Sequence, residues 1–178
     1  MRKEIRISGF GGQGVVLAGY LLGKSLSLYE NLETVMTQSY GPEARGGASS
    51  ANVVFADRTI AYPFVQKADI FVAMSQEAYT RYRPEAASDA IVLIDSGLVV
   101  PDKDDQIHPI PATELAEELG RRIVANVLML GQLSAVTGIV KVGSLEQAIR
   151  TTVNEKVVPL NLKALQRGHT YQIEESVS

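Results

Sequence analysis

The sequence contains no cysteine, no tryptophan and only two histidines, and these absences remove several classes of site. Without cysteine, the chain has no thiolate to bind an iron–sulfur cluster, and it forms no disulfide. His108 and His169 are too few for a zinc centre, which needs three or four ligands, so we expect no metal site in this chain. Any redox metal in its reaction would belong to a partner.

A strong excess of one charge and a long uninterrupted apolar run are also missing. The 178 residues carry a net charge of -3, and their basic residues are scattered, which argues against binding nucleic acid or an anionic membrane. The longest apolar stretch, residues 123–140, is interrupted by Asn126, Gly131 and further polar residues, which predicts a buried helix. Residues 1–4 lead straight into a strand and leave no room for a signal peptide. We expect a cytoplasmic protein with a single domain over residues 1–178.

A glycine-rich turn at residues 8–14 is the most informative segment. It lies between an alternating strand and an apolar helix that begins at Val15. Its spacing, Gly-x-Gly-x-x-Gly, fits the dinucleotide-binding fingerprint, in which N–H groups at the helix start bind phosphate and the third glycine lets the helix pack close to the strand. The candidate cofactor-binding residues are therefore Gly9, Gly11, Gly12, Gln13 and Gly14.

The same fingerprint also requires an acidic residue about twenty positions later, which holds the ribose of the dinucleotide. We expect a second strand at residues 33–38 that completes a βαβ unit. Gln38 and Ser39 stand at its end, however, and Glu33 lies at its beginning. A stand-alone Rossmann protein that binds NAD or another nucleotide is therefore the alternative function, weakened by the missing acid.

A polar loop with glycine and proline follows at residues 39–49. The planar guanidinium of Arg45 could clamp a carboxylate or phosphate, or bind the backbone of a partner. Alternatively, Arg45 pairs with Glu43 in a turn that stabilises only itself. Composition alone leaves both interpretations open.

The rest of the chain alternates strands and helices. We expect strands at residues 50–56, 68–74, 90–97 and 106–111, with a short return strand at 59–61 that forms a hairpin. Helices are expected at residues 76–82 (capped by Ser75), 114–120 (capped by Thr113), 123–137, 145–153 (a capping box at Ser144) and 160–166, which Gly168 would end. This order predicts an α/β fold with a Rossmann-like, mainly parallel sheet flanked by helices and an antiparallel edge hairpin.

Three internal positions carry further expectations. Asp95 ends a buried strand, where residues of parallel sheets face ligands, but we favour a turn-capping or helix-capping role for it. Asn126 lies in an apolar helix and must be hydrogen-bonded, so it either fixes packing or reads a ligand or partner. Gly131, in the same helix, predicts close contact with another element. The chain offers no acid–base pair or nucleophile, so we name no catalytic residue.

Three segments together resemble the gamma subunit of the 2-oxoacid:ferredoxin (or acceptor) oxidoreductases, which include pyruvate, 2-oxoglutarate, 2-oxoisovalerate and indolepyruvate enzymes. They are GFGGQG at residues 9–14, SYGPEARGG at 39–47 and NVLMLG at 126–131. The resemblance extends over essentially the whole chain, and the second segment is far more specific than the glycine fingerprint.

Membership of this family would imply an enzyme subunit that is inactive alone. The complex decarboxylates a 2-oxoacid on thiamine diphosphate, passes electrons through iron–sulfur clusters to ferredoxin or a similar acceptor, and releases acyl-CoA and CO2. The resemblance implies that alpha and beta subunits hold the thiamine and a delta subunit the clusters, so that this chain itself carries no cofactor. It favours 2-oxoglutarate as the substrate, followed by pyruvate.

Two roles then remain for this chain. The glycine turn and Arg45 would contact coenzyme A, whose diphosphate suits a helix N-terminus; equally, the two loops would dock other subunits. The candidate interface residues are Tyr40, Gly41, Pro42, Glu43, Arg45, Gly46, Gly47 and Asn126. A hydrophobic docking face would also allow the isolated chain to form a homodimer. Because the two loops follow the first two strands, both should emerge at the same edge of the sheet.

Overall fold

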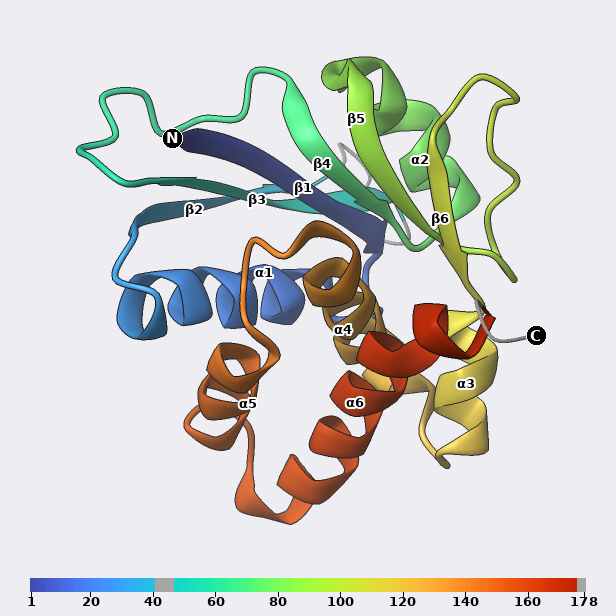
Figure 1. Ribbon diagram of the computed structural model, residues 1–178. Coiled ribbons are helices and arrows are strands. Elements are labelled where there is room, and N and C mark those ends of the chain that lie inside the picture. Colours follow the sequence, from blue (N-terminus) through green and yellow to red (C-terminus); the bar gives the residue numbers. More distant parts are fainter. Residues whose placement is uncertain (41–46, 176–178) are drawn as a thin grey trace.

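The fold is a single sheet with helices on both faces, and the computed structural model describes it for residues 1–40 and 47–175 (Figure 1). The strands are β1 (Arg2–Phe10), β2 (Glu33–Tyr40), β3 (Ala48–Ala56), β4 (Ala68–Ala73), β5 (Ala86–Asp95) and β6 (Ile107–Ile110). The helices are α1 (Val15–Lys24), α2 (Gln76–Tyr82), α3 (Ala112–Glu118), α4 (Ala125–Thr137), α5 (Val142–Arg150) and α6 (Val158–Glu175). A π-helical turn, Ser25–Tyr29, extends α1, and a 3-10 turn, Arg122–Val124, precedes α4.

The sheet order is β2-β3-β1-β4-β5-β6. Strands β1, β4, β5 and β6 are mutually parallel, whereas β3 runs antiparallel to both of its neighbours, β1 and β2. The predicted α/β class, the mainly parallel sheet and the antiparallel edge hairpin are therefore confirmed.

The hairpin is formed by β2 and β3, however, and not by residues 50–61. The predicted return strand at residues 59–61 does not form. Just after β3, the carboxylate of Asp57 binds the N-terminal amine of Met1 at 2.7 Å, and the guanidinium of Arg2 donates to the carbonyl oxygen of Tyr62 at 3.1 Å. Further along, Glu4 accepts the N–H groups of Gln66 and Lys67, at 2.6 and 3.0 Å. These contacts hold residues 57–67 against the start of β1 as a loop.

The expected βαβ unit is also wrong in one respect, because β3 lies between β1 and β2. All nine residues of β3 are buried, whereas the residues of β2 with a described burial are half-buried or exposed. Burial of apolar surface is the main favourable term in folding, so the more apolar strand occupies the interior and β2 takes the edge.

Two apolar cores flank the sheet. On one face, Ile5 and Ile7 of β1 pack with residues of α1, α3, α4, α5 and α6. On the other, Phe71 and Val92 pack with α2. Figure 1 shows the same division, with α2 alone on its side of the sheet. Within the described ranges, no helix is both long enough and apolar enough to cross a bilayer.

Helices α4 and α6 cross at two glycines. A Cβ on Gly131 would overlap the carbonyl oxygen of Leu165, and a Cβ on Gly168 would overlap that of Leu128. The close contact predicted for Gly131 is thus confirmed. The predicted helix end at Gly168 is wrong, because α6 continues to Glu175 and uses this glycine for backbone-to-backbone packing.

Of the predicted caps, Ser75 is confirmed, since its hydroxyl accepts the N–H of Ala78 at 3.2 Å. Thr113 lies inside α3, which begins after Pro111. Ser144 lies inside α5 and donates to the carboxylate of Glu30 at 2.5 Å. Both hydroxyls serve contacts between elements, which a local capping pattern does not reveal.

Candidate functional site

The ends of β1 and β2 lie at the same edge of the sheet. Phe10, the last residue of β1, pairs with Ala48, and Tyr40, the last residue of β2, pairs with the adjacent Ser49. The glycine turn therefore starts at the same edge of the sheet at which β2 ends, with β3 between them, which confirms that both segments leave the sheet at one edge as predicted. Gly41, Pro42, Glu43, Arg45 and Gly46 lie outside the described residues, so their predicted roles stay predictions.

The position of β3 also bears on dinucleotide binding. In a Rossmann fold, the strand that carries the ribose-binding acid is adjacent to the strand that enters the glycine turn. Here β3 separates them, which moves the end of β2 away by one further strand spacing, roughly 4.8 Å. This displacement adds to the missing acid as an argument against NAD.

The side chain of Gln13 fixes the shape of the glycine turn. Its Oε1 accepts the N–H of Phe10 at 2.7 Å, and its Nε2 donates to the carbonyl oxygen of Met74 at 2.9 Å. Gln13 thus ties the end of β1 to the end of β4. Gln13 was predicted to touch a cofactor, and these bonds give it a structural role within the turn.

Gly14 joins the turn to α4. Its φ is +72°, in the left-handed region, and its carbonyl oxygen accepts the Nδ2 of Asn126 at 3.0 Å. A Cβ here would overlap Nδ2 and lie 3.1 Å from Cγ of Asn126. Gly14 is therefore required by its close contact with α4. The close contact between helix and strand that the fingerprint predicts is not the reason for this glycine.

Asn126 is 2% exposed, and its Oδ1 accepts the N–H of Val127 at 2.8 Å. Both ends of the amide are therefore bonded within the chain, which favours the packing interpretation over direct reading of a ligand. Its predicted place in a subunit interface stays a prediction.

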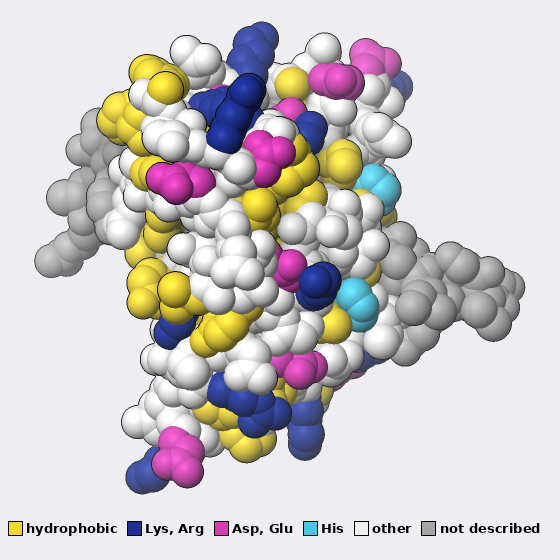
Figure 2. Space-filling model, turned by 60° about the vertical axis from the view of Figure 1, so that its left-hand side comes forward, with side chains coloured by type: hydrophobic (Ala, Val, Ile, Leu, Met, Phe, Trp, Pro, Cys, Tyr) yellow, Lys and Arg dark blue, Asp and Glu magenta, His cyan; other side chains and the backbone are white. Residues whose placement is uncertain are grey.

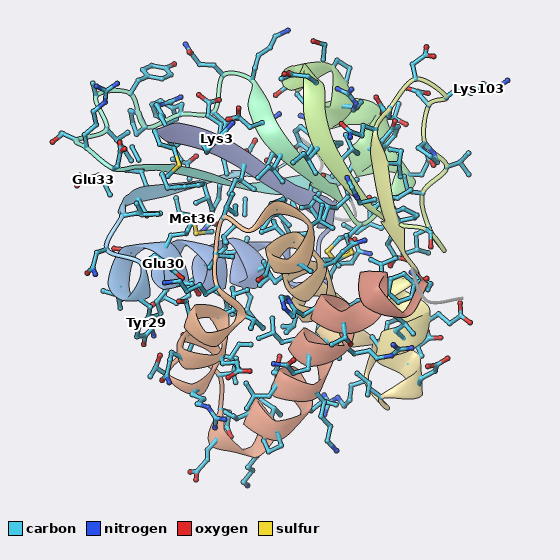
Figure 3. The ribbon with its side chains drawn as sticks, viewed as in Figure 1. Lys3, Tyr29, Glu30, Glu33, Met36 and Lys103 are labelled. Carbon is cyan, nitrogen blue, oxygen red and sulfur yellow. The ribbon has the colours of Figure 1, made fainter. Side chains whose placement is uncertain are left out.

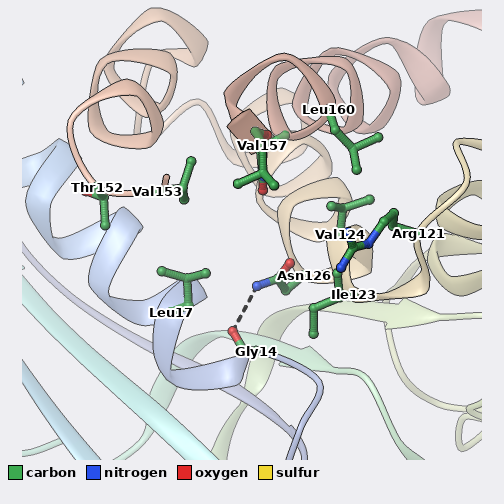
Figure 4. A pocket seen from close by; sticks show the side chains of 11 residues that line it. Gly14, Leu17, Arg121, Ile123, Val124, Asn126, Thr152, Val153, Val157 and Leu160 are labelled. Carbon is green, nitrogen blue, oxygen red and sulfur yellow. Dashed lines mark hydrogen bonds between the residues drawn. The ribbon is translucent and has the colours of Figure 1, made fainter. Parts of the chain in front are cut away.

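Two cavities lie on either side of the segment 121–124. The first, of about 410 Å³, is the α1 groove: Gly14 and Asn126 line it together with Arg121, Ile123, Thr152 and Val157 (Figure 4). The second, of about 260 Å³, is the β4 groove, lined by Gly12, Gln13, Met74, Thr113, Arg122 and Ile123. The glycine turn contributes to both, so a ligand on the turn would also meet this segment.

Two arginines at these grooves are the functional candidates that the sequence did not single out. Both are exposed. Arg122 approaches Glu117 at 3.8 Å, and the guanidinium of Arg121 has no hydrogen bond or ion pair within the described part of the chain. The pair Arg-Arg shortly before Asn126 is the signal that was available in the sequence.

Asp95 has a structural role. Its Oδ2 accepts the hydroxyl and the N–H of Thr113, at 2.6 and 3.0 Å, and its Oδ1 accepts the N–H of Gly97 at 3.2 Å. The side chain is completely buried. The preferred interpretation, capping of a turn and a helix, is confirmed.

A third cavity, of about 620 Å³, lies between α2 and residues 102–105. Here Asp105 accepts the Nε of Arg83 at 2.8 Å and the hydroxyl of Tyr79. The guanidinium of Arg83 holds the pKa of Asp105 below its ordinary value of 3.8. Burial, with the hydrogen bond to Asp105, raises the pKa of Tyr79 to about 12. These groups satisfy one another and fasten the loop to α2.

The histidines form no metal centre. Burial lowers the pKa of His108 below its ordinary value of 6.5. Nowhere in residues 1–40 and 47–175 do three or more histidine, aspartate or glutamate side chains gather as metal ligands would.

Comparison with known proteins agrees with this arrangement. The family model for pyruvate ferredoxin/flavodoxin oxidoreductase matches residues 4–171. The 2-oxoglutarate synthase subunit KorC of Methanocaldococcus jannaschii is 49% identical over 95% of this chain and 93% of its own length. The same subunit of Methanothermobacter thermautotrophicus is 48% identical over 99% and 98%, respectively.

Among solved structures, the gamma subunit of the keto/oxoacid ferredoxin oxidoreductase from Geobacter sulfurreducens PCA matches with a TM-score of 0.88. It is 37% identical to this chain, and the match covers 98% of both chains. The family predicted from the three sequence segments is thus confirmed. This chain belongs to the pyruvate ferredoxin/flavodoxin oxidoreductase family, as a gamma-type subunit.

Proposed function

We propose that this chain is the gamma subunit of a 2-oxoglutarate:ferredoxin oxidoreductase and that its glycine turn, with Arg121 and Arg122, contacts coenzyme A in the assembled enzyme. Two relatives named 2-oxoglutarate synthase subunits, 48–49% identical over nearly the whole chain, support the substrate. Pyruvate is the second candidate.

The observation that carries the coenzyme A contact is the convergence of the α1 N-terminus and two arginines on the same pair of grooves. The first N–H groups of a helix lack partners within the helix and attract phosphate. A guanidinium adds a forked, charged donor for the same group. Leu17, Val124 and Val157 give the α1 groove apolar walls that suit the uncharged remainder of coenzyme A.

The remaining chemistry belongs to other chains. Alpha and beta subunits would hold thiamine diphosphate and the 2-oxoacid, and a delta subunit would hold the iron–sulfur clusters that reduce ferredoxin. We place the complex in the cytoplasm. Residues 1–178 act in it as one domain.

Subunit docking by the same region is the second candidate, and exposed apolar side chains favour it. Phe10 is 39% exposed beside the glycine turn, and Ile123 is 48% exposed between the two grooves. Large exposed apolar groups next to polar loops are typical of protein interfaces.

The test is the Michaelis constant for coenzyme A of the assembled enzyme, measured as viologen reduction with saturating 2-oxoglutarate. Arg121→Ala, Arg45→Ala and Gly12→Asp should each raise KM by about 10-fold or more, since a charge-assisted hydrogen bond contributes about 1.5–3 kcal/mol. Arg58→Ala, at the opposite end of β3, is the matched control and should leave KM unchanged.

Size-exclusion chromatography of the same variants separates the two candidates. An intact complex with an unchanged KM for coenzyme A would overturn the coenzyme A contact. Dissociation of the complex by these substitutions would assign the region to subunit docking. A panel of 2-oxoacids in the same assay tests the substrate, and preference for pyruvate would overturn that part alone.

A further inference from the structure

The two edges of the sheet differ in how they are protected. Strand β6 has four residues, one of which is Pro109, and proline cannot donate to a further strand. Strand β2 has eight residues and pairs with β3 without any register shift. Its only charged residue is Glu33, at its beginning, and it contains no proline. Natural proteins usually blunt an exposed edge with charges, prolines or bulges. Among the described residues, β2 is therefore an edge left open for another strand.

The helix beside this edge exposes two large apolar side chains, on either side of Lys24. Tyr20 is 50% exposed and Leu28 is 61% exposed. Together with Lys24 and with Thr34 and Met36 of β2, they line a shallow cavity of about 270 Å³ along the strand. Figure 3 shows Met36 between β2 and α1, and Figure 2, which views the molecule from this side, shows hydrophobic side chains at the surface. The open strand edge and these two apolar side chains thus form one surface, the β2–α1 edge (β2 with Tyr20 and Leu28).

We propose that the β2–α1 edge binds a second copy of this chain, with the two β2 strands antiparallel and the sheets joined into one. A two-fold axis perpendicular to the sheet produces this pairing. It keeps the faces of the two sheets in common, so the two α1 helices come to lie on the same side, adjacent and antiparallel. Gly19 of α1 lies beside Met36 and Gly23 beside Thr34, so Tyr20 is close to the middle of β2. Tyr20 of each copy then approaches Tyr20 of the other, which removes this exposed ring from water.

The pleat limits the register of such a pair. Residues that lie opposite each other must point to the same face of the sheet, which excludes shifting one strand by a single residue. The axis must therefore pass between one residue of β2 and the same residue of the other copy. With the axis at Thr37, residues 34–40 form a seven-residue ladder, and two threonines meet at its centre, a favourable cross-strand pair. Both Glu33 side chains then lie beyond the ends of the ladder, so no like charges are opposed.

One charged side chain lies beside this surface. The ammonium of Lys24 donates to the carbonyl oxygen of Thr151 at 3.1 Å and to the hydroxyl of Thr152 at 3.0 Å, and it lies 5.9 Å from the centre of the Tyr20 ring. Its charge is therefore bonded within the chain. The strand itself carries no charge from Thr34 to Tyr40, which is what pairing with a second copy requires and what a strongly charged partner would not match.

The absence of cysteine makes the register directly testable. Opposite residues of an antiparallel pair have Cα atoms about 4.5–5.5 Å apart, within the range of roughly 4.4–6.8 Å that a disulfide spans. Thr37→Cys in the full chain should therefore form an interchain disulfide under mild oxidation, seen on non-reducing gels. Ser39→Cys is the matched control on the same strand: its own counterpart would lie four residues away along the strand, roughly 13 Å, so it should stay mostly monomeric.

Light scattering on the full chain tests the association without any cysteine. The wild type should show twice the 19.2 kDa mass of one chain. Tyr20→Glu should shift it to monomer, because the substitution places a charge in the apolar contact near the axis. Val100→Glu, at a 78% exposed valine outside this surface, should leave the dimer intact. The proposal is overturned by a monomeric wild type at 100 µM or above, by equal cross-linking of the two cysteine variants, or by a dimer that Tyr20→Glu leaves unchanged.

Discussion

The contact between Gly14 and Asn126 makes a quantitative prediction, because a methyl group on Gly14 would collide with the amide that Gly14 binds. In Gly14→Ala, the left-handed φ costs about 1–2 kcal/mol for a residue with a Cβ. The displaced Asn126 amide also loses its two buried hydrogen bonds, which we estimate at about 1–3 kcal/mol. The single substitution should therefore destabilise the fold by about 2–5 kcal/mol.

Asn126→Ala alone should cost about 1–3 kcal/mol, because it removes the same hydrogen bonds without backbone strain. In the double variant, alanine at position 126 lacks the Nδ2 and Cγ atoms that a methyl on Gly14 would meet. Only its Cβ remains, 3.6 Å from that methyl. The hydrogen bonds are then lost only once. The double variant should consequently be more stable than the sum of the single effects by about 1–3 kcal/mol.

Urea unfolding of the four proteins measures this coupling. For a chain of 178 residues, each kcal/mol also lowers the melting temperature by about 2–4 °C, which gives a second readout. Additivity within about 0.5 kcal/mol would refute the reasoning, because it would mean that the two residues do not interact.

Three further predictions concern parts away from this contact. Gly168→Ala should destabilise the chain by more than about 3 kcal/mol in urea unfolding, because its methyl would enter the backbone of α4, whereas Gly143→Ala, with open space around it, should be neutral or slightly stabilising. The depressed pKa of Asp105 stabilises the fold above pH 4, and this stability is lost as the pH falls through the pKa of the folded state. The raised pKa of Tyr79 stabilises the fold below pH 10, and this stability is lost as the pH rises toward 12. Asp105→Asn should therefore weaken the dependence of the unfolding free energy on pH in both the acidic and the alkaline range. Glu4→Gln should speed cleavage by protease within residues 57–67, because the buried carboxylate holds that loop, and an unchanged cleavage rate would argue against this role.

The sequence predicts much of the fold because periodicity and capping are local. Strand β4 and helix α2 form where apolar runs and Ser75 indicate. The interior position of β3 cannot be predicted from local patterns, because it depends on which of two neighbouring strands buries more apolar surface. A threonine or serine before a helix likewise reads as a cap, but the hydroxyls of Thr113 and Ser144 bind Asp95 and Glu30, which are distant in sequence.

The candidate site shows the same limit. Asn126 was recognisable as a polar residue that needs partners, yet its partner, Gly14, is 112 positions away. Arg121 and Arg122 resemble an ordinary helix start until the fold brings them to the glycine turn. Tyr40 and Ala48, the described residues that flank most of the specific family segment, are placed by the register of β2 and β3 at the same edge of the sheet as that turn.

The measurement that tests the central claim most directly is the KM for coenzyme A of the assembled oxidoreductase carrying Arg121→Ala, beside the Arg58→Ala control. If the turn and residues 121–124 face coenzyme A, KM should rise about 10-fold or more in the first variant, with kcat unchanged and the complex intact. An intact complex with the same KM for both variants would contradict it.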